Sequence, residues 1–329
     1  MKHIDQLNSK QFIDGVFAGD TAIIARAITL LESSIVAHRK KGAEILEKCL
    51  SESGKSIRIG ITGAPGVGKS TFIEALGNFI LKKNKKLAVL AVDPSSKKSK
   101  GSILGDKTRM QELSKNAAVF IRPTPSGDKM GGVANATRET IILLEAAGYE
   151  IILVETVGVG QNETAVYDIT DVFILLLITG AGDELQGIKR GIMEMADIIA
   201  VNKSDGDNIS KAKNTKSDID RAIHLFQPKD SGWQTSVDII SSITGNGIDE
   251  IWNKIIEHHI LIQTNGWMIK NRNEQFKLWF YDNLNNALLN TFNKNENYRK
   301  MIREYEIKIM NREILPSVAV MELISMLLK

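Results

Sequence analysis

The chain has 329 residues, of which 43% are hydrophobic, so it is long and apolar enough for one large domain with helical additions. Charged residues make up 25% and the net charge is +3, a balance that indicates neither nucleic acid nor a membrane surface as a partner. Cys49 is the only cysteine, which excludes an internal disulfide and a cysteine-based metal cage within one chain and favours a reducing compartment.

Residues 1–53 are expected to form an N-terminal helical segment. The first twenty residues have neither an apolar core nor an arginine-rich amphipathic pattern, so they resemble neither a secretory signal nor a transit peptide. Residues 20–33 place apolar side chains at helical spacing behind Asp20, a candidate N-cap, and residues 36–51 continue in the same style. The longest apolar runs, such as 171–178, fall short of the roughly 20 residues that a membrane span needs. We therefore expect a cytoplasmic protein.

Residues 54–265 alternate short β-rich apolar runs with helical stretches. Such runs are typical of strands buried on both faces of a mostly parallel sheet. The strand candidates are 57–62, 87–92, 118–121, 150–155, 171–178, 197–201 and, less clearly, 237–240. The helix candidates are 69–82, 133–147, 184–195, 208–226 and 248–262. This alternation predicts an α/β domain with a mostly parallel, doubly wound sheet.

No strand pattern continues after about residue 265, so residues 266–329 are expected to form a C-terminal helical extension. The end of the chain places Val320, Leu323, Ile324 and Leu327 on one helical stripe, and aromatic side chains gather earlier in the same segment. Two interpretations stay open: the extension packs on the sheet domain, or it is a dimerisation arm.

A glycine-rich segment, GAPGVGKS, stands between the strand candidate 57–62 and the following helix. It matches the GxxxxGK[ST] pattern of phosphate-binding loops in the strand–loop–helix context that the pattern requires. Its glycines allow backbone N–H groups to turn toward an anion, and the helix directs the positive end of its dipole to the same place. Lys69 adds a charge near the β- and γ-phosphates, and the Ser70 hydroxyl can ligate Mg²⁺. The predicted nucleotide-binding residues are Gly63, Ala64, Pro65, Gly66, Val67, Gly68, Lys69, Ser70 and Thr71. Taken alone, the segment is also compatible with a simple glycine-rich turn.

The segment NKSD follows the strand candidate 197–201, at the sheet edge where ligands bind in open α/β folds. It matches the NKxD motif of GTPases. The Asp205 carboxylate can accept hydrogen bonds from both N1–H and the 2-amino group of guanine, and adenine offers neither donor. Asn202 and Lys203 are expected to brace the loop, and Ser241, Ser242 and Ile243 follow the last strand where GTPases contact the guanine oxygen. The combination predicts GTP rather than ATP.

Carboxylates at the ends of other strands are candidate ligands of Mg²⁺. Glu155 occupies the acidic position of a DxxG-like segment that ends in Gly158, and Asp93 and Asp106 lie on segments expected to approach the phosphates. Loop or helix-capping roles are the alternative for both aspartates. The Gly158 N–H is a natural contact for the γ-phosphate, and Gln161 is a candidate for positioning the attacking water. The candidate catalytic residues are Lys69, Glu155, Gln161 and Lys189, the last in a loop that can respond to nucleotide.

Further runs surround these loops, among them ARAITLLE (25–32), DPSS (93–96), GSILGDKTRM (101–110), ETVGVGQNE (155–163), GAGDELQGIK (180–189) and GIDEIW (247–252). Over about residues 20–265 the chain resembles the methylmalonyl-CoA mutase-associated GTPases, the MeaB/ArgK family. The resemblance implies a P-loop NTPase fold, a homodimer and a chaperone of an adenosylcobalamin-dependent mutase that gates cofactor delivery and protects the mutase. It also implies phosphate and Mg²⁺ roles for Lys69, Ser70, Asp93, Asp106 and Glu155, and no cobalamin site in this chain. The chain departs from the family in KKSK (97–100), where a Pro- and Gly-rich stretch is usual, and in Thr179, where Pro is usual.

Three other functions are weighed against this one. Delivery of nickel, the task of related GTPases, is disfavoured because the chain has one cysteine and because His258 and His259 are adjacent on an expected helix. A kinase or ATPase of amino-acid (lysine/arginine/ornithine) transport is disfavoured by NKSD and by the absence of protein-kinase motifs, but it stays the alternative. A GTPase switch without a mutase partner is the third.

Overall fold

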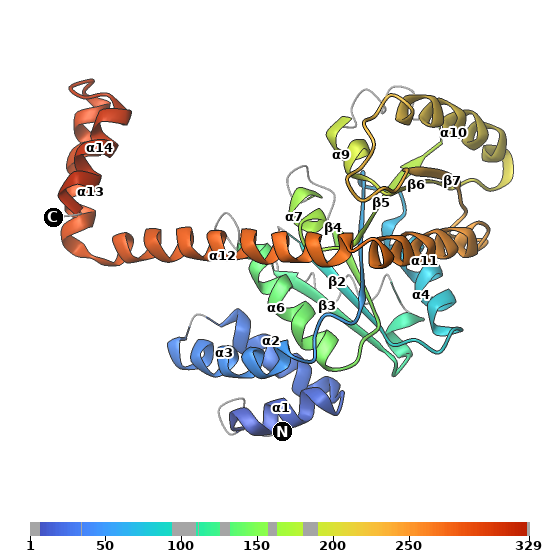
Figure 1. Cartoon of the computed structure of the whole chain (residues 1–329), viewed down its shortest axis with the longest axis horizontal. Helices are drawn as coiled ribbons and strands as arrows, with labels where there is room; N and C mark the ends of the chain where they lie inside the picture. The colour runs from blue at the N-terminus through green and yellow to red at the C-terminus, as the bar shows by residue number, and fades with distance from the viewer. Residues whose placement is uncertain are drawn as a thin grey trace. The chain divides into compact units, whose positions relative to one another are not determined.

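The computed structural model describes residues 7–33, 35–93, 110, 112–125, 132–156, 163–179 and 190–327. The chain divides into two compact units, Met1–Gln275 and Phe276–Lys329 (Figure 1). The first unit contains the sheet with both nucleotide-binding motifs, and the second is helical. The domain boundaries predicted from the sequence, after residues 53 and 265, stay predictions.

The first unit is built on a seven-stranded sheet in which every pair of neighbouring strands is parallel. The strand order is β3-β2-β4-β1-β5-β6-β7. Their bounds are β1 (Ile57–Gly63), β2 (Leu87–Asp93), β3 (Val119–Pro125), β4 (Ile151–Thr156), β5 (Val172–Ile178), β6 (Ile198–Asn202) and β7 (Ser236–Ile239). All seven strand candidates are confirmed, and so is the doubly wound α/β fold.

The strand order reverses direction at β1. After β1 the chain forms β2 and β3 on one side of β1. After β4 it forms β5, β6 and β7 on the other side. In open parallel sheets this arrangement leaves a crevice at the carboxyl ends of the strands, because the connecting segments lead away on both sides. The loop after β1, which holds the glycine-rich segment, therefore lies at the ligand-binding edge of the sheet.

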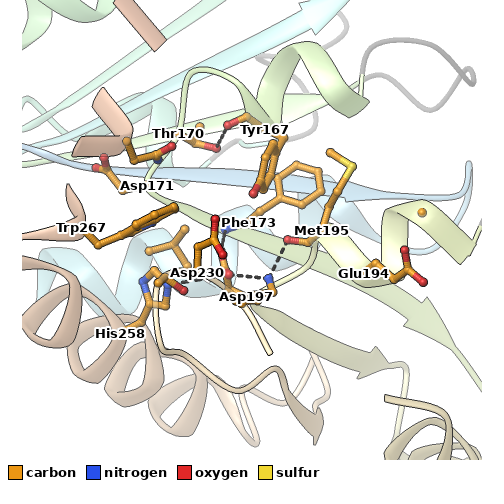
Figure 2. Close-up of a pocket in the computed structure, with 15 residues that line it drawn as sticks. Tyr167, Thr170, Asp171, Phe173, Glu194, Met195, Asp197, Asp230, His258 and Trp267 are labelled. Atoms are coloured by element: carbon orange, nitrogen blue, oxygen red, sulfur yellow. Dashed lines mark hydrogen bonds and ion pairs between the residues drawn. The ribbon is translucent and has the colours of Figure 1, made fainter. Parts of the chain in front are cut away.

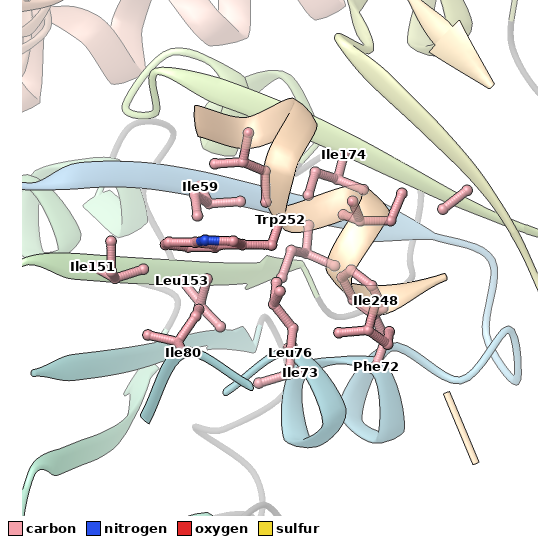
Figure 3. Close-up of a cluster of buried hydrophobic side chains, with 14 of the residues drawn as sticks. Ile59, Phe72, Ile73, Leu76, Ile80, Ile151, Leu153, Ile174, Ile248 and Trp252 are labelled. Atoms are coloured by element: carbon pink, nitrogen blue, oxygen red, sulfur yellow. The ribbon is translucent and has the colours of Figure 1, made fainter. Parts of the chain in front are cut away.

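Helices cover both faces of the sheet. On one face α4 (Lys69–Leu81) and α11 (Ile248–Thr264) pack on alternate residues of the central strands, where Trp252 lies among Ile59, Ile151 and Leu153 (Figure 3). The other face carries α6 (Gly132–Ala146), α7 (Glu163–Tyr167), α9 (Arg190–Met195) and α10 (Ile209–Ile223). Two short 3₁₀ helices, Leu113–Lys115 and Gly206–Asn208, lie in the segments that connect the strands. The helix predicted over 184–195 is described only from Arg190.

The N-terminal segment is helical, as expected, and its helices pack against α6. They are α1 (Ser9–Phe17), α2 (Thr21–Glu32) and α3 (Val36–Leu50). Asp20 is the N-cap of α2, since its Oδ1 accepts hydrogen bonds from the backbone N–H groups of Ala22 and Ile23 at 2.8 and 3.1 Å. Helix α1 had no separate prediction, although its start carries a capping box of Asn8 and Gln11.

Buried ion pairs join the amino-terminal ends of β1 and β5 to neighbouring helices. Arg58 forms a two-pronged pair with Glu145 of α6, with Nε–Oε1 and Nη2–Oε2 both 2.9 Å. Arg272, in the first turns of α12 (Trp267–Lys294), forms a second such pair with Asp171, at 2.8 and 2.7 Å. The Arg272 guanidinium also donates to the carbonyl oxygens of Gly54 and Ser56. The start of α12 is therefore fixed to the base of the sheet.

The second unit consists of the remainder of α12, α13 (Glu296–Met310) and α14 (Pro316–Leu327). Tyr305 of α13 is buried, and its hydroxyl donates to Glu322 of α14 at 2.8 Å. The unit leaves many large apolar side chains exposed, among them Phe280, Leu288, Leu289, Met310, Leu315, Met321 and Ile324. In the part of the chain that the structure describes, no helix has the length and apolar character to cross a membrane.

Candidate nucleotide-binding site

The glycine-rich segment forms a tight loop between β1 and α4. Gly63 has φ 150°, and a Cβ there would lie 2.5 Å from the carbonyl oxygen of Leu176 on the neighbouring strand β5. Gly68 has φ 96° and caps α4, and a Cβ there would lie 2.8 Å from the Asn202 side-chain nitrogen. Only glycine meets both conditions without strain. The first N–H groups of α4 therefore open toward the crevice, as an anion-binding loop requires.

Lys69, the first residue of α4, is 8% exposed and folds back over this loop. Its Nζ donates to the carbonyl oxygens of Gly63 and Ala64 at 2.7 and 3.2 Å. Burial lowers the pKa of the ammonium, and the carboxylates of Glu155 and Glu163 act in the opposite direction. An anion bound in the loop would favour the charged form of Lys69 in the same way as these carboxylates.

Ser70 and Glu155 bring two oxygen ligands together beside the loop. The Ser70 hydroxyl lies 3.4 Å from Oε1 of Glu155, which stands near the carboxyl end of β4 and is 7% exposed. A hydroxyl and a carboxylate at the phosphate end of the crevice fit a magnesium ion, since Mg²⁺ is usually held by one or two such side chains together with phosphate oxygens and waters.

Asn202 links the phosphate loop to the segment after β6. Its Nδ2 donates to the carbonyl oxygen of Val67 at 2.9 Å. Its Oδ1 accepts from the backbone N–H and the hydroxyl of Ser242 at 3.1 and 2.8 Å. One buried amide thus holds three loops, after β1, β6 and β7, in a fixed relation. Lys203, the next residue, has φ 59° and is exposed beside this junction.

The Asp205 carboxylate is oriented by the segment after β7. The Ser241 hydroxyl donates to its Oδ2 at 2.6 Å, and the same hydroxyl accepts from the backbone N–H of Thr244 at 3.2 Å. Oδ1 has no such partner among the described residues and stays available to a ligand. Ile243 is exposed next to this pair. A carboxylate held in this way can accept two donors from the edge of a purine that carries them.

Ser204 and a pair of threonines also position the loops of the site, although the sequence pattern did not predict them. The Ser204 hydroxyl donates to the carbonyl oxygen of Ile240 at 2.6 Å, which adds a second tie between the loops after β6 and β7. Thr156 donates to Thr62 at 3.0 Å, joining the ends of β4 and β1 just before the phosphate loop. Ser204 stands at the variable position of NKxD, where the motif gives no signal. For the contact between Thr156 and Thr62, the sequence shows only that each threonine stands at the end of an apolar run.

Several predicted site residues fall outside what the structure describes. Asp106, Gly158, Gln161 and Lys189 lie outside the described residues. Asp93 ends β2, where its backbone is paired with Pro125, but its side chain is not among those described. The described part of the site therefore brings together Gly63–Thr71, Glu155, Asn202–Asp205 and Ser241–Ile243. The roles of the other five residues stay predictions.

A phosphate loop at the centre of a doubly wound sheet, joined through Asn202 to an NKxD loop, defines a P-loop NTPase of the GTPase class. The model of the family described as "Methylmalonyl Co-A mutase-associated GTPase MeaB" matches residues 24–297. The chain belongs to this family and is a GTPase.

Curated relatives match almost the whole chain. A probable GTPase of Mycobacterium tuberculosis (strain H37Rv) is 43% identical over 309 residues, covering 94% of this chain and 92% of the relative. The GTPase ArgK of Escherichia coli K12 is 41% identical over 305 residues, covering 93% and 92%. The mouse protein named methylmalonic aciduria type A homolog, mitochondrial, is 41% identical over 330 residues, covering 95% and 80%.

A solved structure with the same architecture is described as a LAO/AO transport system kinase. It superposes with a TM-score of 0.80 at 34% sequence identity, and the comparison covers 100% of each chain. The expectation of a MeaB/ArgK-family GTPase with a P-loop fold is thus confirmed.

Proposed function

We propose that this GTPase is a chaperone of an adenosylcobalamin-dependent acyl-CoA mutase of the methylmalonyl-CoA mutase type. In this role GTP binding and hydrolysis gate the loading of the cofactor and protect the mutase from inactivation. The observation that carries the proposal is the match of residues 24–297 to a family described as mutase-associated. The mouse relative, whose name refers to methylmalonic aciduria, supports the same assignment.

We assign the phosphate end of GTP to the loop after β1. Backbone N–H groups of residues 63–71 surround the phosphates, and Lys69 places its ammonium near the β- and γ-phosphates. Ser70 and Glu155 would hold Mg²⁺, which neutralises charge that develops on the phosphates when it is bound. Their 3.4 Å oxygen–oxygen approach supports this assignment. Asp93, Asp106, Gly158, Gln161 and Lys189 are the further residues that we propose around the γ-phosphate.

The guanine base is assigned to the loops after β6 and β7. Asp205 would accept hydrogen bonds from N1–H and the 2-amino group, with Lys203 lying along the base and the segment Ser241–Ile243 at the guanine oxygen. Each charge-assisted hydrogen bond contributes about 1.5–3 kcal/mol, so two of them favour GTP over ATP by several orders of magnitude. The contact from Ser241 to Asp205 supports this assignment, because it removes the entropic cost of orienting the carboxylate.

The test is GTP turnover with and without a purified cobalamin-dependent mutase. We expect slow intrinsic hydrolysis that rises at least tenfold when the mutase is present, because the partner completes or stabilises the loops around the γ-phosphate. An unrelated acyl-CoA enzyme at the same concentration serves as the control. If the mutase neither binds the chain nor changes turnover, the partner assignment is wrong, whereas the GTPase assignment stands.

The alternative is a role in amino-acid transport, which the name of the solved LAO/AO transport system kinase suggests. A kinase or ATPase of that kind would use ATP, and adenine has neither the N1–H nor the 2-amino donor that the Asp205 carboxylate would accept. Hydrolysis of ATP as fast as that of GTP would favour the alternative. A GTPase switch with neither partner is the remaining possibility, and it predicts turnover that no mutase changes.

We also propose that the protein is a cytoplasmic homodimer that uses its C-terminal unit for assembly. Fifteen of the 25 exposed large apolar side chains among the described residues lie between Phe276 and Met326. Exposed apolar surface of this extent is typical of a protein–protein interface. The single cysteine, Cys49, is buried and free, which fits a reducing compartment.

A further inference from the structure

A cavity lies at the amino-terminal ends of β5 and β6, on the edge of the sheet opposite the phosphate loop (Figure 2). Its volume is about 340 Å³, within the range of sites that bind small molecules. Side chains from α7, β5, α9, α11 and the start of α12 line it, together with the segment before β7. All of them belong to the first unit. None of them is needed for the nucleotide site.

Carboxylates dominate the charge of this cavity. Its lining holds Asp171, Glu194, Asp197 and Asp230, against a single ammonium, that of Lys229. Asp171 is paired with Arg272, and Asp197 is paired with Lys229 at 2.6 Å. Asp230 is exposed and makes no hydrogen bond or ion pair with a described residue. One carboxylate of the lining is therefore available to a cationic ligand.

Aromatic rings form much of the remaining wall. Tyr167 and Phe173 meet edge to face, with ring centroids 5.6 Å apart, and Trp267 stands at the start of α12. In the view of Figure 2 the side chain of Asp230 lies between Trp267 and the other two rings. The Trp267 ring already attracts one cation, because Nζ of Lys270 is 5.0 Å from its centroid. Aromatic faces beside a carboxylate are the surroundings that bind ammonium and guanidinium groups.

His258 adds a polar group without adding charge. The side chain is 2% exposed, and burial lowers its pKa, so the ring is neutral at neutral pH. Nε2 lies 3.7 Å from Oδ1 of Asp197, and Nδ1 has no hydrogen-bond partner among the described residues. A neutral His258 ring therefore adds no positive charge to the wall that would repel a bound cation.

We propose that this cavity binds an organic cation, an ammonium or guanidinium group, with the Asp230 carboxylate as its counter-ion and Tyr167 and Trp267 as its aromatic wall. The cation belongs either to a small molecule or to an arginine or lysine side chain of another protein. The site is separate from the nucleotide site and does not rest on the proposed function.

The test is calorimetric titration of the full chain with butylguanidinium, using butylurea as the uncharged probe of the same shape. We expect saturable binding of butylguanidinium at one site and at least tenfold weaker binding of butylurea. Asp230→Asn and Trp267→Leu should each weaken butylguanidinium binding about tenfold, the loss of one charge-assisted or cation–aromatic contact. Asp218→Asn, at an exposed aspartate of α10 outside the cavity, is the matched control and should leave binding unchanged.

Three results would overturn the proposal: no binding of butylguanidinium, equal binding of butylurea, or unchanged binding in the Asp230 variant. Since Asp230 is exposed and unpaired among the described residues, its replacement should leave the fold and GTP hydrolysis intact, and equal thermal unfolding temperatures would check this. A capped Gly-Arg-Gly peptide distinguishes the two sources. Tighter binding of the peptide than of butylguanidinium points to a partner's side chain, and equal or weaker binding points to a free cation.

Discussion

At the scale of single residues, the site depends on small polar side chains that fix larger ones. Ser241 orients the Asp205 carboxylate, and Asn202 holds the phosphate loop against the segment after β7. Both contacts join one part of the protein to another. Both reduce the number of arrangements that the binding groups can adopt, which is how preorganisation raises affinity and selectivity.

The first prediction concerns the choice of base. Asp205→Asn replaces a carboxylate that accepts two hydrogen bonds with an amide that can donate, so GTP binding should weaken by roughly two orders of magnitude or more. Xanthosine triphosphate, which carries a carbonyl in place of the 2-amino group, should become the preferred nucleotide. Fluorescence titration of both nucleotides measures the exchange. Asp207→Asn, at an exposed carboxylate two residues further on, is the control, and unchanged GTP affinity in the Asp205 variant would remove that residue from the base site.

A second prediction concerns Glu139 of α6, far from these loops in the chain. Burial raises the pKa of its carboxyl to about 7, against the opposing effect of Arg39. The folded protein therefore binds a proton more tightly than the unfolded chain, so stability should fall as the pH rises from about 4.5 to 7. Glu139→Gln keeps a neutral side chain at every pH. The free energy of unfolding of this variant should exceed that of the natural protein by about 1–3 kcal/mol at pH 8, and by little at pH 4.5.

Urea unfolding at the two pH values measures this difference. If the stability difference between Glu139→Gln and the natural protein is the same at both pH values, the Glu139 carboxyl titrates normally in the folded state. Glu47 is an exposed glutamate of α3, and the control variant Glu47→Gln should change stability little at either pH.

At the scale of elements, the sequence predicted the sheet and the position of the site within it, but not how helices are attached. Apolar runs at β1 and β5 and the motifs that follow them are local signals, and each became a strand with its loop at the expected edge. The pairs Arg58–Glu145 and Asp171–Arg272 join residues 87 and 101 positions apart, and nothing in the local pattern marks them as partners. Ser204 gave no signal for the same reason, because its partner Ile240 is 36 residues away.

The third prediction concerns the attachment of α12. Burial alone would raise the pKa of the Asp171 carboxyl, but Arg272 and Arg58 together hold it below its usual value. Arg272→Met leaves this carboxylate buried without its main partner, which should cost roughly 3–5 kcal/mol of unfolding free energy. Arg221→Met removes an exposed Arg–Asp pair of α10 and should cost less than about 1 kcal/mol. Denaturant unfolding measures the loss of unfolding free energy in each variant. Equal losses would show that the buried pair stabilises the protein no more than the exposed pair does.

At the scale of the whole molecule, the chain combines a nucleotide-binding unit with a helical unit whose apolar side chains are exposed. The stripe at the end of the chain predicted a helix there, and α14 confirms it. Whether the stripe packs on the sheet domain or on a second copy could not be decided from the sequence, because both arrangements bury the same pattern of residues.

The fourth prediction tests the proposed dimer. Leu288→Glu with Leu289→Glu places two charges on the exposed apolar surface of α12 in the second unit. Burying them in an interface is strongly unfavourable, so the variant should be monomeric at micromolar concentration while GTP binding is retained. Light scattering after gel filtration gives the mass. Leu225→Glu, at an exposed leucine of the first unit, should leave the natural protein's mass unchanged. A dimeric double variant would place the interface elsewhere.

We expect the loops at one edge of the sheet to hold the two ends of a single guanine nucleotide. Calorimetric titration with GTP and with ATP, each in the presence of Mg²⁺, tests it most directly. We predict one GTP per chain and binding of ATP that is weaker by at least two orders of magnitude. Absence of GTP binding, or equal binding of ATP, would show that these loops do not form a site for guanine nucleotides.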